Sequence, residues 1–96
     1  MTNIISQLDK AFDSRVRLGI MSILSVNEST DFNTMKQLME LTDGNLASHL
    51  KALEGIEYIQ SIKQFIGRKP NTKYIITDLG KISFKNHLNA LEKLIK

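Results

Sequence analysis

Two short helical patterns that meet at a tight polar break constrain the fold of this chain most strongly. The first pattern covers residues 32–41, with Asn33 or Thr34 as its expected N-cap. Thr42-Asp43-Gly44 breaks it, and the first two of these residues can cap another helix that begins at once. Apolar residues at i, i+4 and i+7 make this helix one-sided, and we expect Gly55 to end it. The pattern predicts a helix-turn-helix with a leucine stripe formed by Leu46, Leu50 and Leu53.

Further helices are expected on both sides of this pair. Residues 4–12 are weakly helical, and residues 15–26 predict a mostly buried helix behind a polar cap at 13–14. A polar loop is expected at 27–31. The last helix begins at a Thr77-Asp78 cap and continues to the C-terminus.

A β-hairpin separates the helix-turn-helix from the last helix. Residues 58–65 and 72–76 are rich in β-branched and aromatic side chains, which favour strands. Gly67, Pro70 and Asn71 lie between them and are typical of a turn. The predicted fold class is mainly α with a small β-hairpin. The order of elements is that of a winged helix-turn-helix, with a three-helix core, a β wing and a long C-terminal helix.

Cations are concentrated in the second half of the chain. Residues 1–50 contain four Lys/Arg and six Asp/Glu, whereas residues 51–96 contain nine and four. The segment 63–73 holds four cations and no acid, which suits a surface that binds a polyanion. The alternative is a solvated loop whose charges only aid solubility. The four cations are Lys63, Arg68, Lys69 and Lys73.

Composition excludes several classes of function. The absence of cysteine excludes disulfides, thiolate nucleophiles and Cys-ligated metals. His49 and His87 are too far apart for a metal motif, and no catalytic triad, glycine-rich phosphate loop or paired-carboxylate motif is present. We therefore expect no enzyme activity, no metal and no cofactor. With no signal peptide and no apolar run of about 18 residues, residues 1–96 are expected to form one soluble cytoplasmic domain.

Four stretches of the sequence resemble winged-helix transcriptional regulators of the MarR/ArsR type. They are RLGIMSIL at 17–24, LTDGNLASHLKALE at 41–54, GRKPNTKY at 67–74 and TDLG at 77–80. The resemblance implies a dimeric regulator of transcription that binds double-stranded DNA. Its recognition helix would be 43–54, in the major groove, and its wing 63–73, on the backbone or in the minor groove. The chain is shorter than full-length MarR proteins, which leaves open whether it has their ligand cleft or a small-molecule effector. It lacks the cysteines of metal-sensing ArsR proteins, so no thiolate sensor is implied.

The expected recognition helix presents small or polar groups opposite its leucines. Asn can contact adenine with two hydrogen bonds, and Ser can contact several base edges. Lys51 is placed to reach phosphate, where a contact positions the protein without reading sequence. The alternative is a solvated helix face without function. The outer face consists of Gly44, Asn45, Ser48, Lys51 and Ala52.

Three other polar residues have structural and functional interpretations. His49, at the edge of the leucine stripe, is either a packed core-edge residue or a DNA contact, and His87 is expected at an interface or on the surface. Arg17 lies among apolar residues, which indicates a structural ion pair or a helix cap rather than a functional role. The predicted DNA contacts are Thr42, Gly44, Asn45, Ser48, His49, Lys51, Arg68, Lys69, Asn71 and Lys73.

The last helix, within residues 76–96, is the expected dimer interface. Leu79 and Ile82 are expected to pack on the core, and a longer apolar stripe outruns it. A symmetric homodimer would bury this stripe and would demand a pseudo-palindromic operator. The alternative is that the helix packs on the N-terminal segment of its own chain, and both can hold if residues 4–12 join the interface. The stripe consists of Phe84, Leu88, Leu91 and Ile95.

Three rival functions remain open on the sequence alone. A winged helix can serve protein–protein contact without specific DNA binding, and a steep salt dependence of DNA affinity would distinguish the two. Binding of single-stranded nucleic acid requires exposed aromatic residues, and the chain has six aromatics, most of them expected in the core or an interface. A small enzyme is the third rival.

Overall fold

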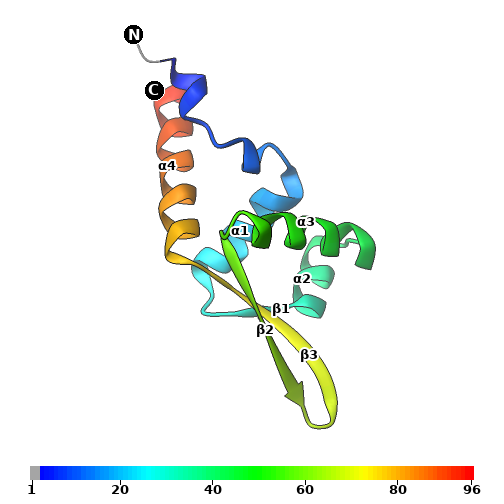
Figure 1. The fold of residues 1–96 in the computed structure, drawn as a ribbon. Helices are drawn as coiled ribbons and strands as arrows, with labels where there is room; N and C mark the ends of the chain where they lie inside the picture. Colours follow the sequence, from blue (N-terminus) through cyan, green and yellow to red (C-terminus); the bar gives the residue numbers. More distant parts are fainter. Residues whose placement is uncertain (1–2) are drawn as a thin grey trace.

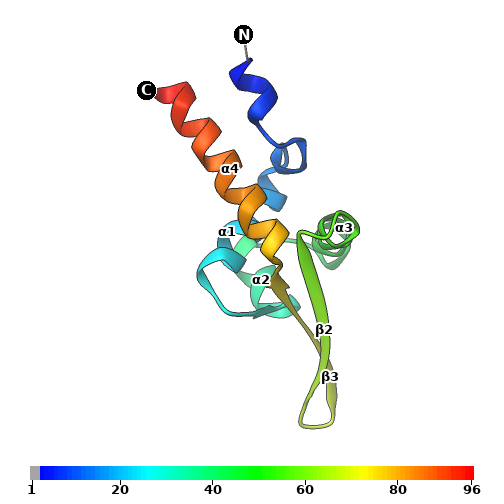
Figure 2. The same cartoon turned by 60° about the vertical axis from the view of Figure 1, so that its left-hand side comes forward.

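The computed structural model describes residues 3–96 and places the wing and the C-terminal helix at opposite ends of the molecule (Figures 1 and 2). Its principal dimensions are 56 × 25 × 21 Å. Within the described residues, no helix is long and apolar enough to cross a membrane. The elements in chain order are η1 (Ile4–Gln7), η2 (Lys10–Phe12), α1 (Arg15–Val26), β1 (Thr30–Asp31), α2 (Phe32–Met39), α3 (Asp43–Gly55), β2 (Ile59–Ile66), β3 (Lys69–Ile76) and α4 (Asp78–Ile95).

Polar side chains start the four α-helices by accepting hydrogen bonds from free backbone N–H groups. Ser14, Thr42 and Thr77 cap α1, α3 and α4, as the sequence predicts. The cap of α2 is Asp31, which accepts from the N–H of Thr34 at 2.8 Å, so the expected cap at residues 33–34 was wrong. Asp31 can do this because it leaves the short strand β1 in an extended conformation.

Left-handed glutamates follow the ends of two helices, α2 and α3. Glu40 adopts a left-handed conformation (φ 52°) and ends α2 two residues before the expected break at Thr42. The α3 helix ends at Gly55, as expected, but the left-handed conformation after it is adopted by Glu57 (φ 65°) and not by the glycine. Two glutamates thus adopt the conformation that glycine would take most easily.

The predicted hairpin is present, and a third strand joins it. The strand order is β1-β3-β2, all antiparallel, so the expected polar loop at 27–31 was wrong for its last two residues. The turn is Gly67-Arg68, with Gly67 at φ +63°. Pro70 lies inside β3 rather than in the turn. It is tolerated there because β1 pairs only with residues 73–74, which leaves the outer edge of β3 free at Pro70.

One hydrophobic core joins the helices to the base of the hairpin. The leucine stripe of α3 is 0–1% exposed and packs toward α1 and β2. This burial fixes the rotation of α3 about its axis, so the opposite face must point outward. The core consists of Phe12, Ile20, Met21, Leu24, Met35, Leu46, Leu50, Leu53, Ile59, Tyr74 and Phe84.

The α4 helix buries one face against the N-terminal segment of its own chain. This face contains Phe84, whose ring meets that of Phe12 edge-on at 5.6 Å, so the expected dimer stripe loses its first member to the protomer core. Leu79 and Ile82 are 47% and 59% exposed, and the expectation that they pack on the core was wrong. The buried face comprises Gly80, Phe84, His87 and Ala90.

Asp9 ties the N-terminal segment to α4 and to the start of the hairpin. Its backbone N–H donates to Nδ1 of His87 at 3.0 Å, and its Oδ2 accepts from the hydroxyl of Tyr58 at 2.6 Å. Burial, followed by this hydrogen bond to a carboxylate, raises the pKa of Tyr58. His87 is 5% exposed and packs against Phe12, so its expected place at the surface or an interface was wrong.

The junction between the hairpin and α4 leaves no room for a side chain at Gly80. A Cβ there would lie 2.1 Å from the carbonyl oxygen of Tyr58, whose backbone is held by a hydrogen bond from the N–H of Thr77 at 3.1 Å. Glycine is therefore required by close backbone approach rather than by its φ angle.

We expect Gly80→Ala to lower the free energy of unfolding by about 1–3 kcal/mol, because α4 must move away from the hairpin. Urea denaturation followed by circular dichroism measures this. Gly55→Ala is the matched control, since a Cβ at Gly55 meets nothing within 4 Å. It should be neutral or stabilise by up to about 1 kcal/mol. Equal stability of the two variants would show that the junction is not tight.

Candidate nucleic-acid interface

The outer face of α3 is exposed along most of its length. Asn45, Ser48 and Lys51 are exposed, as predicted, and Ala47 lies on the same open side. Ala52 is half-buried, so the expected outer face narrows toward the C-terminal end of the helix. The exposed side chains are small except for Lys51, which leaves the N-terminal half of α3 free to enter a groove.

The start of α3 is fixed by its cap. The Oγ1 of Thr42 accepts from the N–H of Asn45 at 3.2 Å. This bond uses the oxygen as an acceptor, so the hydroxyl proton of exposed Thr42 can still be donated to a bound oxygen. A Cβ at Gly44 would meet no atom of the protein within 4 Å, so this glycine contributes open space rather than an unusual backbone conformation.

An ion pair connects the two helices of the helix-turn-helix. Nζ of Lys36 in α2 lies 2.8 Å from Oδ1 of Asp43 in the first turn of α3. The side chains are 40% and 73% exposed, so solvent screens the pair and it contributes little stability. It does place a cation beside the acid in the first turn of this helix. Lys36 was missed at the sequence level because the pairing spans two helices and has no local signal.

His49 makes a hydrogen bond inside the protein. Nε of Arg17 donates to Nδ1 of His49 at 3.2 Å, and both residues are half-buried. The contact is a hydrogen bond to a histidine rather than the ion pair or helix cap expected for Arg17. It requires Nδ1 to be unprotonated. Of the two interpretations of His49, the geometry supports the packed core-edge residue.

The wing divides into an exposed tip and an anchored root. Arg68 and Lys69 at the turn are exposed, as predicted, and so is Lys63. Lys63 belongs to the basic run but is not among the predicted DNA contacts. Its place in a strand that extends beyond the core could have indicated such a contact. Half-buried Lys73 lies at the root, opposite Asp31 in the β1–β3 pairing.

Asn71 connects the wing to the start of α2. Its Nδ2 donates to Oδ2 of Asp31 at 3.3 Å, and its Oδ1 accepts from Nε2 of Gln64 at 2.9 Å. Hydrogen bonds from the side chain and then the backbone of Thr34, with a smaller contribution from Asn71, hold the pKa of Asp31 below its ordinary value. Asn71 was predicted as a DNA contact, and the geometry gives it a positioning role at this junction.

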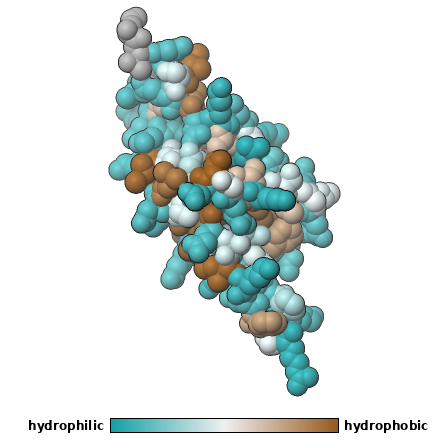
Figure 3. Space-filling model, in the orientation of Figure 1, coloured by the Kyte–Doolittle hydropathy of each residue, from teal (hydrophilic) through white to brown (hydrophobic). Residues whose placement is uncertain are grey.

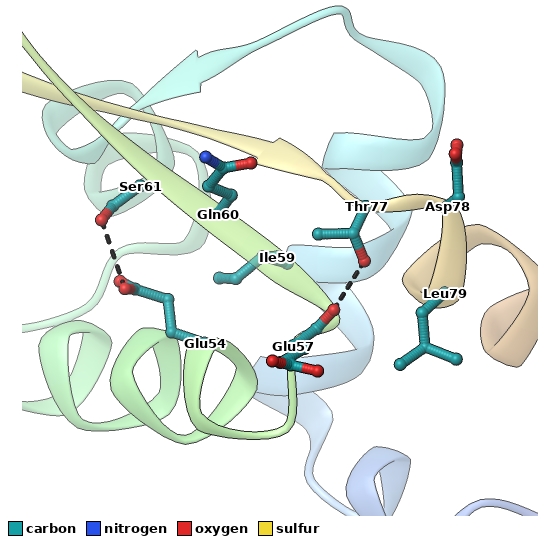
Figure 4. A pocket seen from close by; sticks show the side chains of 8 residues that line it. All are labelled: Glu54, Glu57, Ile59, Gln60, Ser61, Thr77, Asp78 and Leu79. Carbon is teal, nitrogen blue, oxygen red and sulfur yellow. Dashed lines mark hydrogen bonds between the residues drawn. The ribbon is translucent and has the colours of Figure 1, made fainter.

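An acidic hollow lies away from the wing tip, between the end of α3, the start of β2 and the start of α4 (Figure 4). It has a volume of about 560 Å³ and includes the carboxylates of Glu54, Glu57 and Asp78 among its lining residues. The hydroxyl of Ser61 donates to Glu54 at 3.2 Å. Burial, followed by the charge of Glu54, raises the pKa of Tyr74 nearby. Across residues 3–96 no three acidic or histidine side chains are grouped to hold a metal ion.

Residues 16–95 match the family model of a winged helix DNA-binding domain. An uncharacterized protein of Methanocaldococcus jannaschii is 38% identical over 87 residues, which cover 91% of this chain and 95% of the relative. A transcriptional regulator homologue from Pyrococcus horikoshii is 32% identical, with a TM-score of 0.78 and 94% of each chain covered. The YusO protein of Bacillus subtilis shares the fold at 17% identity, with a TM-score of 0.81, over 96% of this chain and 64% of its own.

The lowered pKa of Asp31 predicts a pH-dependent contribution to stability. Because the folded pKa lies below the ordinary value of 3.8, the contribution is present above that pH and is lost as the pH falls through the folded pKa. Asp31→Ala should cost about 0.5–2 kcal/mol near pH 7, and the cost should shrink below about pH 4. Denaturant unfolding at several pH values measures the difference from the unmodified protein.

Asp31→Asn is the control, since an amide oxygen can still cap α2 without a charge that titrates. Its difference in stability from Asp31→Ala should vary little with pH. A cost of Asp31→Ala that is constant down to pH 3 would contradict the assignment.

Proposed function

The chain belongs to the family of winged-helix DNA-binding domains, and on this basis we propose that it is a homodimeric transcriptional regulator that binds a specific double-stranded operator. The resemblance to winged-helix regulators of the MarR type is confirmed, and this family is one of DNA-binding domains rather than enzymes. The main support for the proposal is that the exposed face of α3 lies beside the cationic β2–β3 hairpin.

The α3 helix supplies the part that reads bases. Asn45 and Ser48 lie on its exposed side within its first half, where a recognition helix reaches base edges. Asn suits adenine and Ser suits several bases, so these two residues account for specificity in the major groove. Thr42, Gly44 and Lys51 surround them on the exposed surface and suit contacts with the phosphate backbone.

The wing supplies cations for the backbone or the minor groove. Arg68, Lys69 and Lys63 are exposed on a hairpin that projects from the core at the end opposite the C-terminus of α4 (Figure 2). Lys73 stands closer to the root and suits a phosphate near α2. We give Asn71 and His49 positioning roles, because each already makes hydrogen bonds within the protein.

The α4 helix supplies the dimer contact in this proposal. Leu88, Leu91 and Ile95 remain 44%, 36% and 84% exposed beyond the point where the core ends. Leu94 is 44% exposed beside them, and Ile5 of η1, which packs on α4, is 66% exposed. An exposed apolar strip of this kind suits burial against a second copy. The N-terminal segment therefore covers one face of α4 and can still contribute to the dimer.

A symmetric dimer would present two recognition helices to one face of the duplex. The half-sites would then lie about 34–36 Å apart, and the operator would be pseudo-palindromic. Such a regulator would work in the cytoplasm, where the DNA is. The rival function is a winged helix that binds only protein, and it is separated from the proposal by the salt dependence of DNA binding.

Two sets of variants should affect DNA binding in different ways. Arg68→Ala/Lys69→Ala should weaken binding to all duplexes similarly and flatten the salt slope by about 1–2 units, because phosphate contacts are lost.

Asn45→Ala and Ser48→Ala should each cost about 1–3 kcal/mol on the specific site and much less on random DNA. Fluorescence anisotropy over a range of salt concentrations, with a duplex selected from random sequences, measures both.

Lys85→Ala/Lys93→Ala is the control for lost charge, since both lysines are exposed on α4, away from the wing. It should leave the salt slope unchanged. If the unmodified protein binds no duplex with a steep salt dependence, the DNA-binding function is wrong and the protein-binding rival stands. If the α3 variants weaken specific and random binding equally, these residues only position the protein.

The dimer is tested by Leu88→Glu/Leu91→Glu. We expect a folded monomer that binds a half-site weakly, because full burial of such side chains contributes about 1.5–3 kcal/mol each before the costs of association. Sedimentation equilibrium gives the mass, and circular dichroism confirms the fold. Ile82→Glu is the control, since Ile82 is exposed on another side of α4 and should leave the dimer intact. A double variant that stays dimeric, or an unmodified protein that is monomeric at micromolar concentration, contradicts the proposed interface.

A further inference from the structure

The tip of the wing carries exposed apolar side chains among its cations. Phe65 is 73% exposed and Ile66 is 58% exposed. Phe65 lies directly across the hairpin from Pro70, which is also exposed. The space-filling view shows hydrophobic atoms that interrupt the hydrophilic surface of the wing near its tip (Figure 3). Neither Phe65 nor Ile66 belongs to the core.

Phe65 differs from every other aromatic residue of the chain. The remaining five belong to the core or pack against it, so they stabilise the fold. Phe65 projects from the part of the hairpin that extends beyond the core, where it makes no comparable contribution. A partner that covers this ring would remove its apolar surface from water, which is favourable. The five aromatic residues of the core region are Phe12, Phe32, Tyr58, Tyr74 and Phe84.

We propose that Phe65 contacts deoxyribose and base edges in the minor groove, as an apolar wedge set between the cations of the wing. The inference rests on the proposed DNA-binding function and adds a residue that determines specificity. Apolar wedges on basic elements are known to press between base steps and to bend the duplex. The chemistry that Phe65 meets is therefore the sugar and the stacked base edges, while Arg68 and Lys69 meet the phosphates on either side.

Charge decides between DNA and other occupants of this patch. Residues 63–73 contain four cations and no acid, so the surface around Phe65 is complementary to a polyanion. A second copy seated on the same patch would bring the wing cations of both chains together, and like charges would oppose that contact. The acids Glu54, Glu57 and Asp78 line the hollow at the base of the hairpin, away from this patch (Figure 4).

A wedge would let the wing discriminate among sequences without a hydrogen bond to any base. Steps that unstack readily, such as pyrimidine–purine steps, should accept the ring more easily than stiff steps. The minor groove also differs between A·T and G·C pairs, because guanine places an amino group there. Phe65 would therefore set a preference in the sequence that flanks the bases read by α3.

The test compares Phe65→Ala and Phe65→Leu with the unmodified protein on the selected duplex. Phe65→Ala should lower affinity by about 5- to 30-fold at every salt concentration, which is the effect of partial burial of one apolar side chain in a groove. The salt slope should stay unchanged, because no phosphate contact is lost. Phe65→Leu should retain most of the affinity. Thermal unfolding should match the unmodified protein, since the residue is outside the core.

Replacing guanine by inosine, one position at a time in the flanking sequence, tests whether Phe65 lies in the minor groove. This replacement removes the minor-groove amino group and leaves the major-groove acceptors in place. The unmodified protein should bind at least one such duplex more tightly, and Phe65→Ala should lose that gain. Ile82→Ala, which removes a 59% exposed apolar side chain from α4, should behave like the unmodified protein in both assays.

The outcomes separate this inference from the function on which it rests. If the unmodified protein binds no duplex, both fall. If it binds DNA and Phe65→Ala binds equally well, the wedge alone is overturned. A flatter salt slope for Phe65→Ala would also overturn it, because the ring would then act only by placing the cations. If Phe65→Ala changes the oligomeric mass in solution but not the DNA affinity, the wedge is overturned and the patch is assigned to contact between chains.

Discussion

Burial of the three leucines of α3 is the constraint on which the rest of the structure depends. Leu46, Leu50 and Leu53 are 0–1% exposed, packed toward α1 and the base of the hairpin. Rotation of α3 by one residue would expose a leucine and bury a polar or charged group, and both changes are unfavourable. The orientation of Asn45 and Ser48 toward solvent is therefore a consequence of the core. The face that reads DNA in our proposal is held by contacts on the other side of the helix.

A second set of contacts connects the two ends of the molecule through the base of the wing. The backbone of Tyr58 meets α4 at Gly80, and its hydroxyl binds Asp9, which in turn binds His87 on α4. The start of β2, the N-terminal segment and α4 are therefore held as a unit. In a dimer joined through α4, the position of the interface would therefore fix the position of the wing. Backbone atoms packed this closely cannot shift independently of one another.

Electrostatics divides the surface along the hairpin. Cations gather at the tip of the wing, whereas Glu54, Glu57 and Asp78 surround the hollow at its base. Asp43, the acid in the first turn of α3, is paired with Lys36. An approaching duplex would be drawn to the tip and repelled from the base, which orients the protein before any specific contact forms.

The sequence by itself determined the order of the α-helices and the hairpin, most caps and the basic run of the wing, because these depend on neighbours within a few residues. Ser14, Thr42 and Thr77 cap helices through bonds to residues three positions on, and Leu46, Leu50 and Leu53 share a face by helical period alone. Tertiary structure decided what depended on distant partners. Asp31 became a cap because β1 pairs with β3, and His87 became buried because Asp9 packs over it. Phe84 lies in the core rather than in an interface, and Phe65 lies outside the core. The path of the chain, and not the local pattern, decides which apolar side chains are buried.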